Sequence, residues 1–67
     1  MKKPTGLVDK NGVPISEGDT LHSYVTRSDF KVIINKGGDF DVQSEKGTIS
    51  LTERVLDVWD MEVKWKN

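Results

Sequence analysis

One histidine, one tyrosine and two tryptophans are the side chains of this sequence best suited to chemistry or recognition. A histidine acts as a general base or a metal ligand only when other polar groups converge on it, and no ligand set with a suitable spacing surrounds His22. The sequence has no cysteine, which excludes disulfides, thiolate metal sites and cysteine nucleophiles. We therefore interpret His22 as an exposed or half-buried strand residue without a catalytic role.

The acidic and glycine-rich segments also lack the spacing of a catalytic or cofactor site. Asp39, Asp41 and Glu45 gather around one predicted hairpin, but their spacing does not match a calcium-binding loop. Gly37-Gly38 and Gly18 do not stand between a strand and a helix with the lysine that phosphate binding requires, so we interpret them as turn residues. No serine stands in a nucleophile motif. The sequence therefore predicts no enzyme activity, no metal and no cofactor.

Several strand residues predict a protein-binding surface instead. His22 and Tyr24 share one face of a predicted strand, opposite its apolar face, and Ile33 lies opposite the apolar face of the next strand. If these faces are exposed, they form a contact surface for another protein or for a second copy of the chain. Trp65 is a further candidate anchor of this surface.

Nucleic-acid binding is the alternative interpretation. Lys31, Lys64 and Lys66 could contact phosphates while aromatic rings stack on the bases of a single strand. Against it, both tryptophans and both phenylalanines stand in the apolar phase of their segments, which also suits them to the core of a small domain. Ten basic and eleven acidic residues give a net charge of −1, so no strong overall field attracts nucleic acid or anionic lipid.

Short strands joined by turns must position these side chains. The segments 20–26, 30–35 and 40–44 alternate in strand fashion, and turn residues such as Asn11-Gly12 separate the apolar segments. Val13-Pro14-Ile15 reads as a short edge segment, because a proline cannot donate to a ladder.

The C-terminal part of the sequence predicts a helix and then a last strand. Apolar residues at helical spacing indicate a short helix near residues 51–59, and Ser50 with Glu53 matches the spacing of a capping box. Met61, Val63 and Trp65 then alternate with charged residues, which predicts a closing strand with one buried face.

The predicted architecture is one small β-rich domain over residues 7–67, preceded by a flexible leader over residues 1–6. It is mainly β, either an SH3-like barrel or a strongly bent antiparallel sheet of about five short strands with one short helix. The marginal size of the core and an unpaired edge at 13–15 or 61–65 also favour self-association.

Apolar runs are short throughout the sequence. The longest, such as Val32 to Ile34, are far below the ~20 residues of a membrane span, and no apolar stretch follows the basic N-terminus as in a secretory signal. We therefore predict no membrane association and a cytoplasmic location.

The stretch from Asp9 to Leu21 resembles the opening of the YopX-type phage and prophage proteins. The matching positions are Asp9, Asn11, Gly12, Ile15, Glu17, Gly18 and Asp19. The resemblance implies a phage or prophage origin and a small β-rich fold, and it carries over no catalytic residue. Together these inferences predict a non-enzymatic accessory protein that binds a host or phage protein, for example to inhibit a host defence or nucleic-acid-processing complex. A small nucleic-acid-binding β-barrel is the alternative.

Overall fold

A computed structural model of the chain describes residues 3–66. In this part of the chain, the strands are β1 (Pro4–Val8), β2 (Pro14–Ser16), β3 (Thr20–Ser23), β4 (Ser28–Ile34), β5 (Phe40–Ser44), β6 (Gly47–Ser50) and β7 (Met61–Trp65), and the helix is α1 (Glu53–Val58). The predicted mainly β fold with one short helix is therefore confirmed. None of the helical structure described is long and apolar enough to cross a bilayer.

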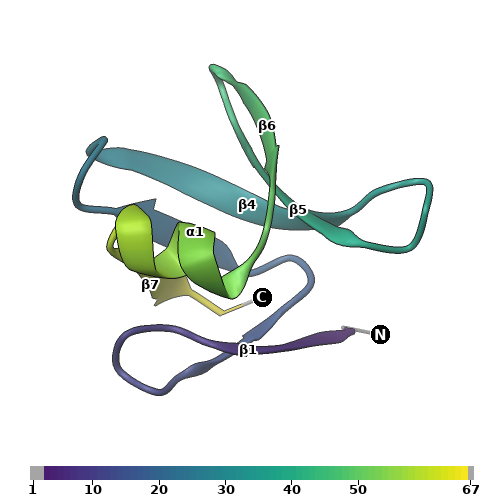
Figure 1. Cartoon of the computed structure of the whole chain (residues 1–67), viewed down its shortest axis with the longest axis horizontal. Helices are drawn as coiled ribbons and strands as arrows, with labels where there is room; N and C mark the ends of the chain where they lie inside the picture. Colours follow the sequence, from purple (N-terminus) through teal and green to yellow (C-terminus); the bar gives the residue numbers. More distant parts are fainter. Residues whose placement is uncertain (1–2, 67) are drawn as a thin grey trace.

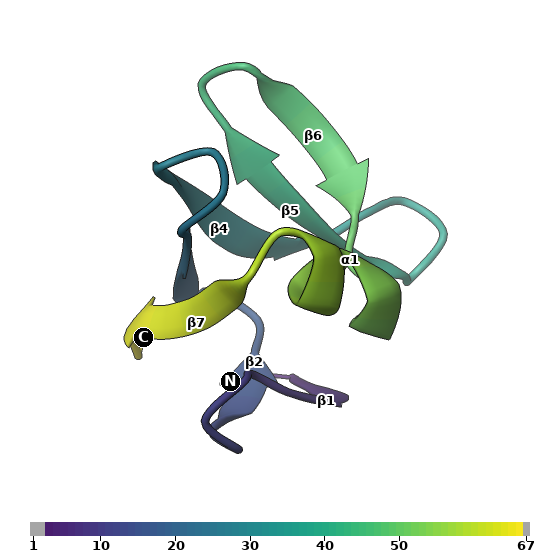
Figure 2. The same ribbon diagram turned by 60° about the vertical axis from the view of Figure 1, so that its left-hand side comes forward.

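Five strands form one antiparallel sheet in the order β6-β5-β4-β3-β7, and β1 pairs with β2 in a separate hairpin. Because β6 and β7 end the sheet at opposite sides, the sheet is open. Of the two predicted alternatives, the antiparallel sheet is thus confirmed. The SH3-like barrel is not, because the sheet does not close. In both views, helix α1 lies between the β1–β2 hairpin and the β5–β6 end of the sheet (Figures 1 and 2).

The core lies between one face of this sheet and the helix and hairpin that cover it. Its buried residues are Ile15, Leu21, Phe30, Val32, Val42, Leu51, Leu56 and Met61. Strand periodicity directs every second residue of β3, β4 and β5 to this side. Ser23 is a buried polar residue of β3, and its Oγ donates a hydrogen bond to the Trp59 carbonyl oxygen at 2.6 Å. This bond joins the end of α1 to the end of β3.

Two glycines with positive φ make the N-terminal turns possible. Gly12 (φ 79°) lies in the turn of the β1–β2 hairpin, and Gly18 (φ 88°) lies in the turn before β3. The Gly18 N–H donates to the Val32 carbonyl oxygen at 2.8 Å, so this turn packs closely against β4. Such φ values are unfavourable for residues with a Cβ, which is why these turns require glycine.

Two strand boundaries differ from the prediction. β1 begins at Pro4, so residues 4–6 of the predicted leader belong to a strand, while residues 1–2 lie outside the described residues. β3 ends at Ser23 rather than at residue 26, because Tyr24 to Arg27 form the turn into β4. Arg27 has a positive φ of 57° in this turn.

Helix α1 is confirmed but shorter than the predicted 51–59. Thr52, not Ser50, is its N-cap: the Thr52 side chain accepts a hydrogen bond from the Val55 N–H at 3.1 Å. The helix ends where Asp60 takes a positive φ of 48° and the chain turns toward β7. The predicted capping box is therefore replaced by a cap two residues later.

Candidate functional site

The sheet face turned away from α1 and the hairpin is here named the outer face. Directly paired residues of neighbouring strands point to the same side of a sheet. Thr20 and His22 of β3 point to the outer face, so their cross-strand partners do too. These partners are Asp29 and Lys31 of β4, and Glu62 and Trp65 of β7.

A β-bulge in β7 turns Trp65 onto the outer face. Residues 61–63 pair in regular order with residues 23–21, but Trp65 rather than Lys64 faces Thr20. Lys64 is thus the extra residue of the bulge. In a regular strand, Trp65 would point toward the core, whereas here its side chain is 64% exposed. The predicted buried face of residues 61–65 is therefore wrong at Trp65, and of the two alternatives left open for this residue, core or interface, the exposed position fits the second.

Asp29 holds two basic groups together on the outer face. His22 Nδ1 lies 2.8 Å from Asp29 Oδ1, and Lys64 Nζ donates to Asp29 Oδ2 at 2.9 Å. The contacts with His22 and then Lys64 hold the pKa of Asp29 below its ordinary value. The His22 ring meets the Tyr24 ring edge-on, with the ring centroids 4.7 Å apart.

Tyr24 continues this set of contacts toward the β1–β2 turn. Its hydroxyl donates to Glu62 Oε1, and Asn11 Nδ2 donates to Glu62 Oε2 at 2.9 Å. The Lys10 ammonium lies 4.2 Å from the centroid of the Tyr24 ring and 3.3 Å from Asp60 Oδ1. The hydrogen bond between the two side chains raises the pKa of Tyr24 and lowers the pKa of Glu62. The Tyr24 ring, 48% exposed, is thereby held in one orientation.

The structure brings four of the predicted binding residues together. These are His22, Tyr24, Lys64 and Trp65. Lys31 and Ile33 lie further along the same face, because alternate residues of β4 point to one side.

Lys66 does not belong to this surface. Its Nζ donates to Asp19 Oδ2 at 2.6 Å and to the Pro14 carbonyl oxygen at 2.5 Å. Asp19 is fully buried, so Lys66 serves the fold at the turn between β2 and β3. Lys66 thus has a structural contact in the fold, and its role as a binding contact stays a prediction.

Four residues of the contact network were not predicted from the sequence. Asp29 and Glu62 could have been found from the alternation of their strands, which places each beside His22 once the pairing is known. Lys10 and Asn11 precede Tyr24 by more than ten residues and reach it only through the packing of the hairpin, so no local signal marks them.

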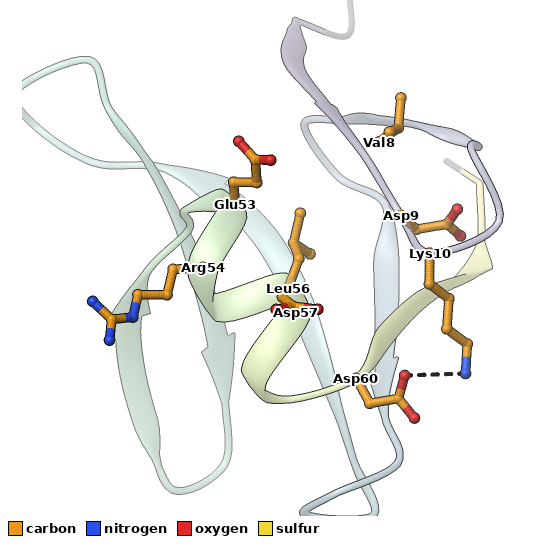
Figure 3. Close-up of a pocket in the computed structure, with 8 residues that line it drawn as sticks. All are labelled: Val8, Asp9, Lys10, Glu53, Arg54, Leu56, Asp57 and Asp60. Atoms are coloured by element: carbon orange, nitrogen blue, oxygen red, sulfur yellow. Dashed lines mark ion pairs between the residues drawn. The ribbon is translucent and has the colours of Figure 1, made fainter.

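A hollow of about 710 Å³ lies between the β1–β2 hairpin and α1. Figure 3 shows the ion pair between Lys10 and Asp60 across one end, and the Arg54 guanidinium directed away from the hairpin. None of its lining residues is a histidine, serine or threonine. Among residues 3–66, no group of three or more His, Cys, Asp or Glu side chains is placed to hold a metal ion.

Asp9, which lines this hollow, has a structural role. Its Oδ1 accepts hydrogen bonds from the N–H groups of Asn11 and Val13, and its Oδ2 accepts one from the Val63 N–H at 2.9 Å. Burial alone would raise the pKa of Asp9, but these backbone donors outweigh burial and hold the pKa below its ordinary value. A carboxylate committed to three donors is poorly placed to act as a catalytic base.

No protein-family model matches the chain, and neither the search of curated proteins nor the search of solved structures returned a similar protein. The resemblance of residues 9–21 to the YopX-type proteins therefore stays a prediction. In the structure, the residues that carry it build turns: Asp9 binds the hairpin turn, and Gly18 and Asp19 join the next turn to β4.

Proposed function

We propose that this protein is a non-enzymatic binding module that recognises another protein through its outer face. The observation that carries this proposal is the exposure of Trp65 beside the group formed by His22, Tyr24 and Lys64. A chain of 67 residues can bury only a small core, in which a tryptophan contributes much to stability. Tryptophan and tyrosine are also the residues that most often dominate the binding energy of protein interfaces. Tyr24 and Trp65 are the proposed anchors.

The charges of the outer face support a protein partner over nucleic acid. Of the three lysines predicted to contact phosphate, Lys64 is paired with Asp29 and Lys66 with Asp19. Within residues 3–66, only Lys31 of the three has no carboxylate ion pair. Carboxylates on the same face also oppose phosphate binding. The proposed partner is a host or phage protein, such as a component of a host defence or nucleic-acid-processing complex.

A nucleic-acid-binding domain is the second candidate. It is favoured by one observation: the Lys64 ammonium lies 6.0 Å from the centroid of the exposed Trp65 ring. A ring on which a base stacks, next to a cation, is the combination used by proteins that bind single strands.

Affinity capture from a bacterial host lysate tests the proposal. The tagged wild-type protein is compared with Trp65→Ala, Tyr24→Ala and the control Val58→Ala. Val58 is 59% exposed on α1, on the other side of the sheet, so its variant also removes an exposed apolar side chain. We expect the wild type and Val58→Ala to retain one protein in stoichiometric amount at high salt, and the other two variants to lose it.

Two results would count against the proposal. Capture that is unchanged by Trp65→Ala and Tyr24→Ala would show that the outer face is not the binding surface. Recovery only of material that nuclease or added salt removes would support the nucleic-acid alternative, because phosphate contacts weaken steeply with salt.

A further inference from the structure

Strand β6 presents backbone hydrogen-bonding groups along its outer side. In an antiparallel ladder, alternate residues bond to the neighbouring strand, and the residues between them direct their N–H and C=O groups the other way. The Leu51 N–H donates to the Phe40 carbonyl oxygen at 3.0 Å, so the odd-numbered residues of this strand bond to β5. Thr48 and Ser50 therefore direct their backbone groups to the free edge, and both residues are exposed.

The opposite edge of the sheet, β7, is protected. The Val63 N–H at this edge donates to the buried carboxylate of Asp9, and the bulge at Lys64 interrupts the strand. Covered donors and bulges are means by which proteins prevent unwanted strand pairing. β6 has neither: its sequence, Gly-Thr-Ile-Ser, has no charge or proline, and its register with β5 is regular. In both views, β6 forms the outer margin of the sheet (Figures 1 and 2).

The outward backbone groups of β6 are complementary to those of a second β6 in antiparallel orientation. A two-fold axis through Ile49 would pair Thr48 of each copy with Ser50 of the other, so that the outward donors and acceptors meet. Glu45-Lys46 precede β6, and Glu53-Arg54 follow it at the start of α1. Residues 45–46 form the turn that leads into β6, and α1 begins at Glu53, so the paired segment is confined to β6 itself.

An apolar hollow adds to this complementarity on the inner side of β6. It has a volume of about 250 Å³. Its apolar surface comes from Ile49, Phe30 and Trp59, and the rings of the last two meet edge-on. Polar residues line its rim: Thr26, Ser28, Ser44, Lys46 and Thr48. The two-fold arrangement would place Ile49 of the second copy directly beside Ile49 of the first. Pairing would thus cover apolar surface that the isolated small domain leaves accessible.

We propose that the protein forms a symmetric dimer in which β6 pairs with β6 of a second copy, so that the two open sheets become one continuous sheet. β6 and β7 lie at opposite ends of the sheet. The dimer contact is therefore separate from the anchors Tyr24 and Trp65 of the proposed partner-binding surface, and each can be present without the other.

Sedimentation velocity over about a hundredfold range of protein concentration tests this dimer. The wild type is expected to show a reversible species of twice the chain mass of 7.6 kDa. Thr48→Pro removes the outward N–H from each copy but no bond to β5, so the dimer Kd should rise about thirtyfold through two lost hydrogen bonds. Thr48→Val keeps the N–H and should dimerise like the wild type. Circular dichroism verifies that both variants fold.

Two outcomes would contradict this dimer. A wild type that stays monomeric at every concentration overturns the proposal. A dimer that Trp65→Ala dissociates and Thr48→Pro does not would also overturn it, because association would then use the outer face.

Discussion

At the scale of single residues, two buried aspartates organise the turns of this small domain. Asp9 is only 5% exposed, yet each of its carboxylate oxygens accepts backbone hydrogen bonds, two within its own turn and one from β7. A buried charge is tolerated when donors of this kind surround it. The carboxylate of Asp19 likewise accepts a hydrogen bond from the Ser16 N–H at 2.9 Å. These residue types are therefore explained by the fold before any function is assigned to them.

Asp9→Asn tests this structural role. The amide NH₂ of asparagine cannot accept hydrogen bonds, so we expect the free energy of unfolding at neutral pH to fall by about 2 kcal/mol. Because the folded-state pKa of Asp9 is lowered, its stabilisation is complete above the unfolded-state pKa of about 4 and is lost as the pH falls through the folded-state pKa. Urea unfolding across this acid range should therefore show a steeper loss for the wild type than for Asp9→Asn.

The control for this prediction is Asp57→Asn, an exposed position of α1. Its stability at neutral pH should stay within about 0.5 kcal/mol of the wild type. If Asp9→Asn is equally mild and its acid dependence equals that of the wild type, the hydrogen bonds to Asp9 do not contribute to stability as argued.

At the scale of elements, strand alternation predicted buried positions well where strands are regular. Leu21, Phe30, Val32 and Val42 stand at alternating positions of the predicted strand segments, and all four are in the core. The same reasoning failed at Trp65, because a bulge adds one residue to β7 and reverses the direction of the side chains that follow.

The cause of that failure is tertiary. The edge of β7 is bound by Asp9, and Lys66 is bound by Asp19, and both aspartates lie more than 40 residues earlier in the chain. The same limit applies to the candidate site: Asp29, the partner of His22 in the next strand, follows from local patterns, whereas Glu62 and Lys10 join the site only through long-range packing. Sequence periodicity therefore predicted the strands and the exposure of several residues. It did not predict which strands and turns pack together to form one surface.

The two tryptophans provide a matched test of the bulge. Trp59 packs against the core, with its ring centroid 5.7 Å from that of Phe30, so Trp59→Ala should lower the free energy of unfolding by about 2 kcal/mol. Trp65→Ala should change it by less than about 0.5 kcal/mol. Acrylamide should quench fluorescence more strongly in Trp59→Phe, which retains Trp65, than in Trp65→Phe. Equal quenching and equal stability losses would show that Trp65 is packed like Trp59.

At the scale of the whole molecule, the open sheet has two edges: other parts of the chain bind one of them, and the other is free. β7 is held by contacts to the N-terminal hairpin and the turn before β3, so the C-terminal part of the chain closes onto its beginning. β6, at the other end, projects from the rest of the sheet (Figure 2). The molecule thus has one closed end that presents the outer-face anchors and one open end suited to pairing with another strand.

Lys66→Met tests how strongly the closed end depends on the contact between residues 66 and 19. The variant removes the cation 2.6 Å from the buried Asp19 carboxylate while keeping an apolar side chain, so we expect the free energy of unfolding to fall by about 2 kcal/mol. Lys10→Met is the control, because Lys10 and Asp60 are both largely exposed and such pairs contribute about 0.5 kcal/mol or less. Since salt screens exposed charges more than buried ones, added NaCl should abolish the effect of Lys10→Met and leave most of that of Lys66→Met.

Equal, salt-sensitive losses of stability in urea unfolding of the two variants would mean that the Asp19 carboxylate does not depend on Lys66. The hydrogen bond from the Val63 N–H to Asp9 would then be the contact that holds β7 to the N-terminal hairpin.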